Sequence, residues 1–171
     1  MIINIRKSTI NDFDFLVETE HACFPKFQQS SLRTLKLSLI SDKQEVWIAE
    51  TKSGKNNLQI GAMVLHINSR TLRVYSIAVL KKYQGKGIGN KLITHACNLA
   101  LARRNEKISL EARANDEKLI KWYEKAGFIK TKLLPDYYKK GESAYRLVFK
   151  VSRKKVSDAI TNLIVVDKPS K

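Results

Sequence analysis

The first part of the chain alternates between a strand-like and a helix-like spacing of hydrophobic residues. Ile2–Arg6 alternates weakly between apolar and polar side chains, which is the period of a β-strand. After Asn11-Asp12, a pair suited to cap a helix, apolar residues recur at helical spacing until Pro25. A second helical period follows Ser30 and Ser31, either of which can act as the N-cap. The pattern predicts one strand and then two amphipathic helices.

Three apolar runs follow, separated by polar turns. Val46–Glu50, Gln59–Ile67 and Leu72–Val79 have the length and composition of β-strands. Ser53–Asn57 and Asn68–Thr71 lie between them and contain the Gly, Asn and Ser residues that are typical of tight turns. The three runs therefore predict an antiparallel meander.

After residue 79 the pattern changes to strands that alternate with helices. A basic loop with three glycines, Lys81–Gly89, leads into a long amphipathic helix. The remaining predicted elements are a strand at Ile108–Ala112, a helix at Asp116–Ala126 that Gly127 ends, and strands at Phe128–Leu134 and Ser143–Val151. This order predicts a single α/β domain with a mixed sheet over residues 1–151.

Residues 152–171 fit no upstream pattern and are interpreted as a basic C-terminal extension of unknown structure. Their apolar run, Asn162–Val166, either adds an edge strand or packs on the surface of the domain. The sequence does not decide between these two alternatives.

The chain is strongly basic throughout its length. Its 171 residues include 32 Lys and Arg against 16 Asp and Glu, a formal net charge of +16, and 43% of them are hydrophobic. That hydrophobic content excludes a disordered basic tail protein. Residues 151–171 contribute only +3, so the domain itself carries +13. The charge admits nucleic acid, a phosphorylated cofactor, an anionic surface or an acidic peptide as partner and does not choose among them.

Cysteine and histidine positions argue against a metal site. Cys23 and Cys97 lie far apart, and the three histidines show no ligand-like spacing. The N-terminus has no signal-peptide pattern, and no apolar run reaches the length of a membrane span. We expect a soluble cytoplasmic protein without a metal.

The glycine-rich loop is the strongest chemical signal in the sequence. Gln84–Gly89 follows a predicted strand and opens a helix, where main-chain N–H groups can converge on a phosphate. Four lysines surround it: Lys81, Lys82, Lys86 and Lys91. The alternative is an ordinary solvated loop at a helix start. The loop lacks the Gly-Lys-Ser/Thr of ATP-binding loops and the last glycine of the dinucleotide motif, which disfavours an ATPase or an NAD enzyme.

Three motifs in this order resemble the GNAT acetyltransferase superfamily. They are Ile77-Ala-Val79 with Tyr83–Gly89, Leu110–Arg113, and Trp122–Phe128, and the likeness spans residues 2–151. Phe24-Pro25, Glu111, Tyr123 and Tyr137-Tyr138 are similar in particular to ribosomal-protein N-α-acetyltransferases of the bacterial type.

This resemblance implies a fold and a co-substrate. The sheet would be mostly antiparallel, would splay after its fourth strand and would carry helices on both faces. Acetyl-CoA would lie in the splay, held by Ile77, Ala78 and Val79 along the strand and by Gln84, Gly85, Lys86, Gly87, Ile88 and Gly89 at the pyrophosphate. Where the superfamily commonly has Asn, this chain has Asp116 preceded by Asn115, so either residue could contact the co-substrate.

The resemblance also implies catalytic and acceptor-binding residues. Tyr123 would face the thioester sulfur and act as general acid. Glu111 is a charged residue on an otherwise apolar strand, which is costly unless it is paired or faces a cavity. It would be a general base, or else an ion-pair partner of Arg113 or of another basic residue. Tyr137 and Tyr138 would line the acceptor cleft.

Phe24 and Pro25 would lie on the opposite side of that cleft. The expected reaction is direct attack of an amine on acetyl-CoA in a ternary complex, without an acyl-cysteine intermediate. The expected acceptor is a protein N-terminal α-amine. Two alternatives stay open: a small-molecule amine or lysine side chain as acceptor, or a basic RNA- or ribosome-binding module that has kept the fold.

Overall fold

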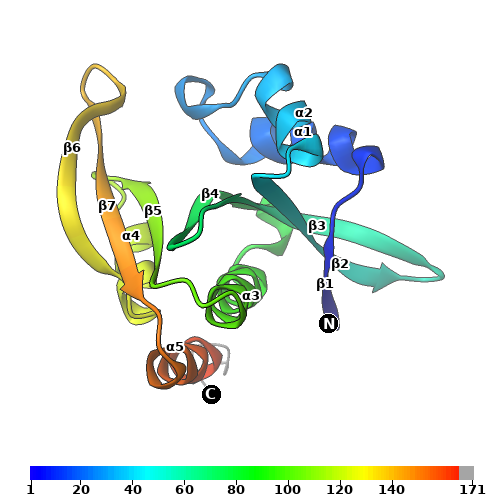
Figure 1. Cartoon of the computed structure of the whole chain (residues 1–171). Helices are drawn as coiled ribbons and strands as arrows, with labels where there is room; N and C mark the ends of the chain where they lie inside the picture. Colours follow the sequence, from blue (N-terminus) through cyan, green and yellow to red (C-terminus); the bar gives the residue numbers. More distant parts are fainter. Residues whose placement is uncertain (166–171) are drawn as a thin grey trace. The chain divides into compact units, whose positions relative to one another are not determined.

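Residues 1–165, the part of the chain that the structure describes, form seven β-strands and five α-helices in this computed structural model (Figure 1). In chain order these are β1 (Ile3–Lys7), α1 (Phe13–Cys23), α2 (Leu32–Ile40), β2 (Gln44–Ser53), β3 (Asn56–Ile67), β4 (Thr71–Val79), α3 (Ile88–Ala102), β5 (Lys107–Arg113), α4 (Glu117–Lys125), β6 (Ile129–Lys139), β7 (Glu142–Lys150) and α5 (Arg153–Val165). The predicted elements of residues 1–151 are all present, with boundaries shifted by a few residues.

The chain divides into two compact units, which are described separately. The first unit contains residues 1–67 and 74–95, and the second contains residues 68–73 and those from 96 onward. Strand β4 and helix α3 each contribute residues to both units. Strand order is β1-β2-β3-β4 in the first unit, and β4-β5-β7-β6 in the second, where β4 is represented by its first three residues.

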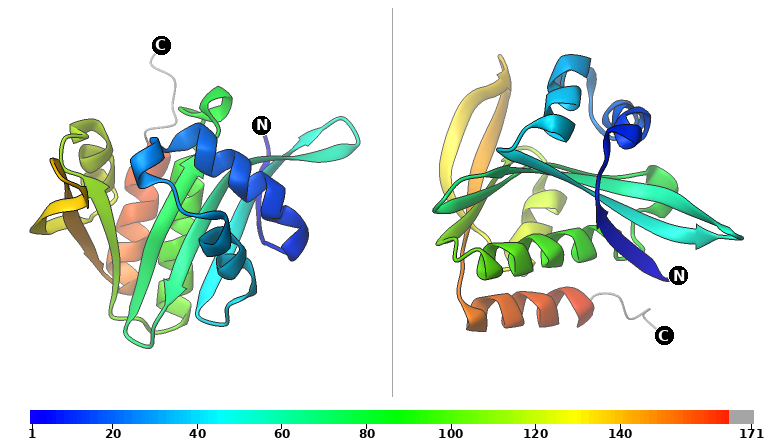
Figure 2. Two further views of the ribbon diagram at one scale, coloured as in Figure 1. Left: turned by 90° about the horizontal axis from the view of Figure 1, so that it is seen from above. Right: turned by 45° about the vertical axis from the view of Figure 1, so that its right-hand side comes forward.

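The first unit is the predicted antiparallel meander. Strand β1 pairs antiparallel with β2, with Ile3 opposite Thr51, and β2 pairs antiparallel with β3, with Gln44 opposite His66. Helices α1 and α2 cover one face of these strands, and the first part of α3 lies on the other (Figure 2). Helices on both faces of the sheet, as expected, are therefore observed in this unit.

Alternation along β2 explains how the first unit buries both faces. The core under α1 and α2 joins Phe15, Leu16 and Leu35 to Val46, Ile48, Ala62 and Val64. Val46 and Ile48 of β2 point into this core. Trp47 between them points to the opposite face, where its ring lies 4.1 Å from that of His95 of α3, measured between centroids. Successive side chains of a strand point to opposite faces, so one strand serves both layers.

The start of α1 differs from the predicted cap. Asp12 occupies the N-cap position, but its carboxylate accepts hydrogen bonds from the Thr9 N–H at 2.7 Å and from both terminal nitrogens of Arg6 at 2.8 and 2.9 Å. The Arg6 guanidinium is the main reason why the pKa of Asp12 lies below its ordinary value. Ser31 does cap α2 as predicted, accepting from the Thr34 N–H at 3.1 Å.

The second unit is built on the antiparallel neighbours β5, β7 and β6. Register pairs Glu111 of β5 with Arg146 of β7. Tyr123, Phe128 and Phe149 stack edge-on or tilted in its core, with centroids 5.4 to 5.6 Å apart. Gly127 ends α4 at φ +91°, as its sequence position predicts, and a Cβ there would come within 3.1 Å of the Phe149 ring.

Strand β6 is longer than predicted, and this corrects the placement of two tyrosines. Tyr137 and Tyr138 belong to β6 and not to a loop. The predicted strand ended at Leu134, and the next residue, Pro135, cannot donate a hydrogen bond to a ladder. Here β6 is the edge strand, its register shifts between Leu134 and Lys139, and Asp136 has a φ of +52°. An edge strand with such an irregularity tolerates proline.

The C-terminal extension forms helix α5, so the edge-strand alternative for Asn162–Val166 is wrong for its described part; Val166 lies outside the described residues. Val156, Ala159 and Leu163 are buried, and their spacing of three and four is helical. The predicted run began at Asn162 and missed the two earlier members of this face. Packing on the domain surface, the other alternative, is what α5 does through its contacts with α4.

The observed architecture confirms the predicted α/β fold with a mixed, mostly antiparallel sheet. The splay after the fourth strand stays a prediction.

Candidate active site

The end of β4 and the glycine-rich loop are joined by hydrogen bonds in the first unit. Ile77, Ala78 and Val79 lie in β4 as predicted. The Val79 carbonyl accepts from the Gln84 side-chain amide at 2.9 Å and from the Cys23 thiol at 3.4 Å. Gln84 thus ties the first residue of the loop back to the strand, which fixes where the loop begins.

The glycines of the loop take the conformations that a phosphate-binding loop requires. Gly85 and Gly87 have φ values of +73° and +77°, which side-chain-bearing residues rarely adopt. Apart from Gly85 and its two chain neighbours, no described residue has an atom within 4 Å of the place a Gly85 Cβ would occupy, so that side of the loop is open. Helix α3 begins at Ile88, and the N–H groups of its first turn have no partner within the helix. The loop and the helix start therefore offer main-chain donors in one place.

Lysines add positive charge around these donors. Lys81, Lys82, Lys86 and Lys91 are all exposed. The ammonium groups of Lys82 and Lys86 lie 5.8 and 5.3 Å from the centre of the Tyr83 ring. Exposed lysines beside main-chain donors at a helix start make an anion site with little cost in buried charge.

Gly61 is a residue of this region that the sequence analysis missed. A Cβ at Gly61 would stand 2.9 Å from the Ala78 carbonyl oxygen and 3.4 Å from side chains of Ile88 and Val79. Strand β3 can therefore approach β4 and the start of α3 only because residue 61 has no side chain. A glycine inside a predicted strand was the available signal.

The connection between α1 and α2 carries Phe24 and Pro25 in the first unit. Phe24 ends α1, and its carbonyl accepts from the Gln29 side chain at 2.8 Å. Glu20 of α1 is 3% exposed, and its carboxylate accepts from the Ser30 N–H at 2.5 Å. The connection is thus fixed at both ends, which holds Phe24 and Pro25 in a defined position.

Glu111 lies in the second unit between two arginines. Its Oε2 accepts from Arg73 Nε at 3.0 Å and Nη2 at 2.8 Å, and its Oε1 accepts from Arg146 Nε at 3.0 Å and Nη2 at 2.9 Å. A carboxylate has about four acceptor positions, and all four are used here. The ion-pair alternative is confirmed, with Arg73 and Arg146 as partners and not Arg113. The role of Glu111 as general base stays a prediction.

The two tyrosines of β6 are connected to this ion cluster. Arg73 Nη2 also donates to the Tyr137 hydroxyl at 2.9 Å, and the Tyr138 hydroxyl donates to the Glu111 main-chain oxygen at 3.4 Å. The two rings meet edge to face at 4.9 Å. Burial, more than its charged neighbours, raises the pKa of Tyr138 to about 12. The structure therefore brings Glu111, Tyr137 and Tyr138 together through Arg73, a residue that the sequence had not singled out. The role of the two tyrosines in acceptor binding stays a prediction.

Tyr123 lies on the buried face of α4 and is 4% exposed. Burial is the main cause of a pKa well above the ordinary value of tyrosine, and the nearby Tyr138 and Asp116 raise it further. The phenol therefore keeps its proton across the physiological range, which is what a proton donor requires.

Asp116 has a defined structural task. One carboxylate oxygen caps α4 by accepting from the Leu119 N–H at 3.0 Å, and the other accepts from Arg113 at 3.1 Å. Asn115 beside it is exposed. Both oxygens of Asp116 are thus already engaged within the protein. Whether Asn115 or Asp116 contacts the co-substrate stays a prediction.

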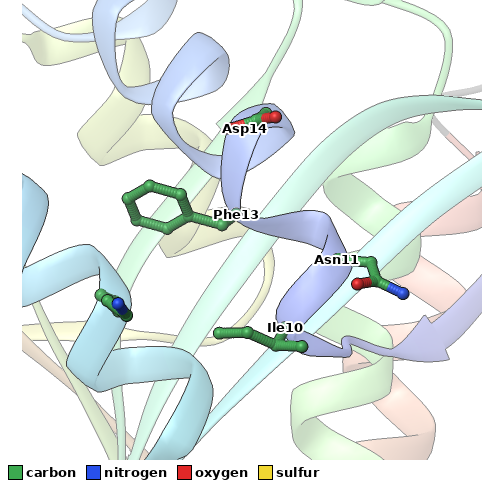
Figure 3. Close-up of a pocket in the computed structure, with 5 residues that line it drawn as sticks. Ile10, Asn11, Phe13 and Asp14 are labelled. Atoms are coloured by element: carbon green, nitrogen blue, oxygen red, sulfur yellow. The ribbon is translucent and has the colours of Figure 1, made fainter.

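A surface pocket elsewhere in the first unit contains none of the predicted site residues. It lies between the start of α1 and α2, and Figure 3 shows Ile10 and Phe13 beside it. Its lining residues are Ile10, Asn11, Phe13, Asp14 and Lys36. Among the described residues, no group of three or more His, Cys, Asp or Glu is placed to hold a metal ion, and no helix is long and apolar enough to cross a membrane.

The open glycine loop at the start of a helix, after a strand of a mixed sheet, is the arrangement that the sequence motifs predicted. A protein-family model, described as the acetyltransferase (GNAT) family, matches residues 13–128. The chain belongs to the GNAT acetyltransferase family.

Individual members similar to the chain are N-α-acetyltransferases. N-alpha-acetyltransferase 30 of Schizosaccharomyces pombe is 33% identical over 98 residues, which are 54% of this chain and 65% of that protein. The chain spans between about 42% and 65% of the length of the first four curated relatives it matches.

Solved structures resemble the chain over most of its length. The ribosomal-protein-S18-alanine N-acetyltransferase from Escherichia coli superposes with a TM-score of 0.78 at 21% identity, covering 88% of this chain and 95% of that one. The NatC complex bound to Gag peptide and CoA contains a chain with a TM-score of 0.76 and 25% identity, covering 89% of this chain and 100% of that one. These likenesses confirm the GNAT fold.

Proposed function

We propose that this protein transfers the acetyl group of acetyl-CoA to the N-terminal α-amine of a protein. The observation that carries this proposal is the open glycine loop at the start of α3, in a GNAT chain whose curated relatives are named N-α-acetyltransferases. The NatC relative was solved with a peptide and CoA. Docking to a ribosome, which the charge suggests, would be a further step and is not needed for this activity.

The residues of the first unit fit a co-substrate with a pyrophosphate. Main-chain donors of Gly85 through Gly89 would hold the phosphates, and the four loop lysines would supply counter-charge. The strand residues Ile77 and Val79 would bind the pantetheine arm through their main chain. The thioester, when bound, supplies an acetyl group activated for attack by an amine.

The occupied carboxylate of Glu111 favours an α-amine as acceptor. Because Arg73 and Arg146 fill its acceptor positions, Glu111 can take a proton only after one of these bonds breaks. An α-amine, with a pKa of about 7.8, is neutral in about one molecule in seven at about pH 7. A lysine amine, with a pKa of about 10.4, is neutral in about one in 2,500. A site without a free base therefore suits the α-amine.

We assign Glu111 a positioning role in this reaction. It holds Arg73, and Arg73 in turn holds the Tyr137 hydroxyl. Tyr137 and Tyr138 would contact the backbone at the acceptor's N-terminus. A pair of aromatic rings in which an arginine fixes one hydroxyl can position a peptide with little further ordering on binding.

Tyr123 would protonate the leaving thiolate. The neutral amine nitrogen forms the new bond to the acetyl carbon, the carbon–sulfur bond breaks, and the sulfur takes the phenolic proton. The nitrogen releases one proton to water, and water returns one to Tyr123. Burial raises the pKa of Tyr123, so the phenol is protonated near neutral pH and gives up its proton only as negative charge develops on the sulfur. Release of the thiol and reprotonation of Tyr123 complete the cycle.

The test is a panel of acceptors with labelled acetyl-CoA. Peptides with a free N-terminus should be acetylated, and the same peptides with a blocked N-terminus, polyamines and aminoglycosides should not. Tyr123→Phe should lower kcat about 100-fold, and Tyr145→Phe, a half-buried tyrosine of β7, should leave kcat unchanged. Acetylation of small amines with free peptides untouched would overturn the proposed acceptor, and an active Tyr123→Phe enzyme would overturn the role of Tyr123.

A further inference from the structure

The excess positive charge is concentrated in the second unit. The first unit contains twelve Lys and Arg and seven Asp and Glu, whereas the second contains twenty and nine. The four lysines of the glycine loop belong to the first unit. Acetyl-CoA binding therefore leaves the larger part of the excess charge without a function.

Much of this charge gathers at one end of the second unit, which we call the basic end. Its members, all exposed, are Arg70, Arg104, Lys107, Lys150, Arg153, Lys154 and Lys155. The start of β5 and the end of β7 lie at the same end of the strands, and α5 begins there (Figure 1).

Strand pairing and hydrogen bonds connect these segments. Lys107 and Lys150 are direct cross-strand partners, and they form the last pair at one end of the β5–β7 ladder. The Val151 N–H donates to the Glu106 carbonyl at 2.9 Å, and the Glu106 N–H donates to the Arg70 carbonyl at 2.9 Å. Glu106 also forms an exposed ion pair with Arg70 at 2.7 Å. The basic end is therefore one continuous surface made from the β3–β4 turn, the α3–β5 turn, β7 and α5.

Two placements at the basic end work against stability. Like charges directly opposite each other on an antiparallel pair repel, and Lys107 faces Lys150. The first turn of a helix favours acidic residues, yet α5 begins with Arg153, Lys154 and Lys155. The cross-strand lysine pair and the basic first turn of α5 both break a rule of local stability, and both lie at the same end of the strands. Rules of this kind are most often broken where function requires it.

The composition of the basic end indicates what it binds. The three segments that form the basic end, residues 68–71, 103–107 and 150–155, contain none of the exposed large hydrophobic residues of the described chain. The basic end therefore lacks the anchors that protein interfaces and membrane-surface helices use. Single-stranded nucleic acids are held by stacking on aromatic rings, which this surface does not offer among its members. Duplex backbones are instead bound through lysine and arginine contacts to phosphates and through N–H groups at helix starts. We propose that the basic end is a docking surface for the phosphate backbone of double-stranded nucleic acid.

The surface is independent of the acetyl-transfer site in its residues. None of its members is among the residues assigned to acetyl-CoA, to the acceptor or to catalysis. Loss of docking should therefore leave acetylation of a free peptide unchanged, and loss of acetylation in Tyr123→Phe should leave docking unchanged. The two proposals can fail separately.

The test measures binding of the full chain to labelled duplexes of about 20 base pairs, one of RNA and one of DNA, as a function of salt. Lys107, Lys150, Lys154 and Lys155 are changed together to Gln. The matched control changes four exposed lysines of the first unit to Gln: Lys36, Lys43, Lys52 and Lys55. Wild-type protein should bind at about 1–100 μM near physiological salt, with a steep salt dependence.

The variant at the basic end should bind about 30-fold or more weakly at about 0.1 M salt, and the slope of log K against log salt should fall by about three to four. The control variant should keep both. Binding of both duplexes supports recognition of the shared phosphate backbone, and binding of the RNA duplex alone supports recognition of its A-form geometry.

Three results would overturn the proposal. The first is equal duplex affinity in the wild type and the variant at the basic end. The second is tighter binding to polyglutamate or to anionic lipid vesicles than to either duplex. The third is tighter binding to the single strand. Thermal unfolding keeps the test interpretable, because removing the Lys107–Lys150 repulsion should leave Tm unchanged or higher.

Discussion

The two units contain the same kind of three-charge cluster with the signs reversed. In the first unit one arginine, Arg6, binds two carboxylates, Asp12 at 2.8 Å and Glu50 at 2.9 Å. In the second, one carboxylate, Glu111, binds two arginines at 2.8 and 2.9 Å. The central group is the partly exposed one in the first cluster and the buried one in the second.

This reversal has an energetic consequence. The Asp12 and Glu50 side chains are only 5% and 6% exposed, so removal of the arginine leaves two buried anions without a counter-charge. The Arg73 and Arg146 side chains are 30% and 42% exposed, so water can solvate both cations when Glu111 is removed. The first cluster should therefore matter more to stability than the second, in which solvent reaches the two arginines but not the central carboxylate.

Removing the central arginine of the first cluster should have the largest effect on stability. Arg6→Met should lower the free energy of unfolding by about 3 kcal/mol, because both carboxylates lose their charged partner. Arg33→Met, on the exposed side of α2, should change it by less than about 0.5 kcal/mol. Urea denaturation measures both. Equal, small losses would show that water reaches the Arg6 cluster.

Removing the central carboxylate of the second cluster should lower the free energy of unfolding less than removing Arg6 does. It should also lower activity. Glu111→Gln should lower the free energy of unfolding by about 2 kcal/mol. The exposed Glu124, whose nearest cation is Lys130 at 3.6 Å, is the matched control and should cost less than about 0.5 kcal/mol as Gln.

The pH dependence of Glu111→Gln separates positioning from base catalysis. If Glu111 only positions Arg73 and Tyr137, the loss of kcat/KM should be the same factor at about pH 7 and at about pH 9, where an α-amine is mostly neutral. Recovery of the variant at the higher pH would instead identify Glu111 as the base.

Acid should lower the stability of the wild-type protein more than that of a variant that lacks the Asp12 carboxylate. The pKa of Asp12 is lowered in the folded protein, mainly by Arg6, so its contribution to stability is present above its ordinary value near 3.8 and is lost as the pH falls through the folded pKa. Wild-type protein should therefore lose stability below about pH 4 more steeply than Asp12→Asn. Parallel curves from urea denaturation would contradict the depressed pKa.

The smallest expected effect is a gain. Lys107→Gln and Lys150→Gln should each raise the free energy of unfolding by a few tenths of a kcal/mol, because each removes the same cross-strand repulsion. The double variant should gain less than the sum of the two single changes. A fully additive cycle would show that the two ammonium groups do not interact.

The parts of the site that depend on local sequence could be predicted, and those that depend on strand pairing could not. Gln84–Gly89 carries its geometry in its own glycines, two of which adopt positive φ. The partners of Glu111 are Arg73 and Arg146, which are 38 and 35 residues away in the chain. Arg146 faces Glu111 only because β7 pairs with β5 while β6 takes the edge. Nothing in the local pattern of either strand indicates that order.

The same reasoning explains the errors in the predicted elements. Proline normally ends a strand, so the pattern around Pro135 gave no sign that β6 continues through Tyr137 and Tyr138. The strand can continue there because β6 is an edge strand. Among the described side chains of α5, Val156, Ala159 and Leu163 are buried, which makes its apolar face narrow. The short apolar run at the end of the helix was the more visible pattern in the sequence. Such weak amphipathic patterns gain their meaning from the surface they pack against.

The most direct test of the proposed function is competition within one peptide that has a free N-terminus and one lysine. After incubation with acetyl-CoA, fragmentation mass spectrometry locates the acetyl group. We predict at least about tenfold more acetyl on the α-amine than on the lysine at about pH 7, with the ratio narrowing as the pH rises toward the lysine pKa. Acetyl found mainly on the lysine at about pH 7 would contradict N-terminal acetylation and the argument from the occupied Glu111 carboxylate.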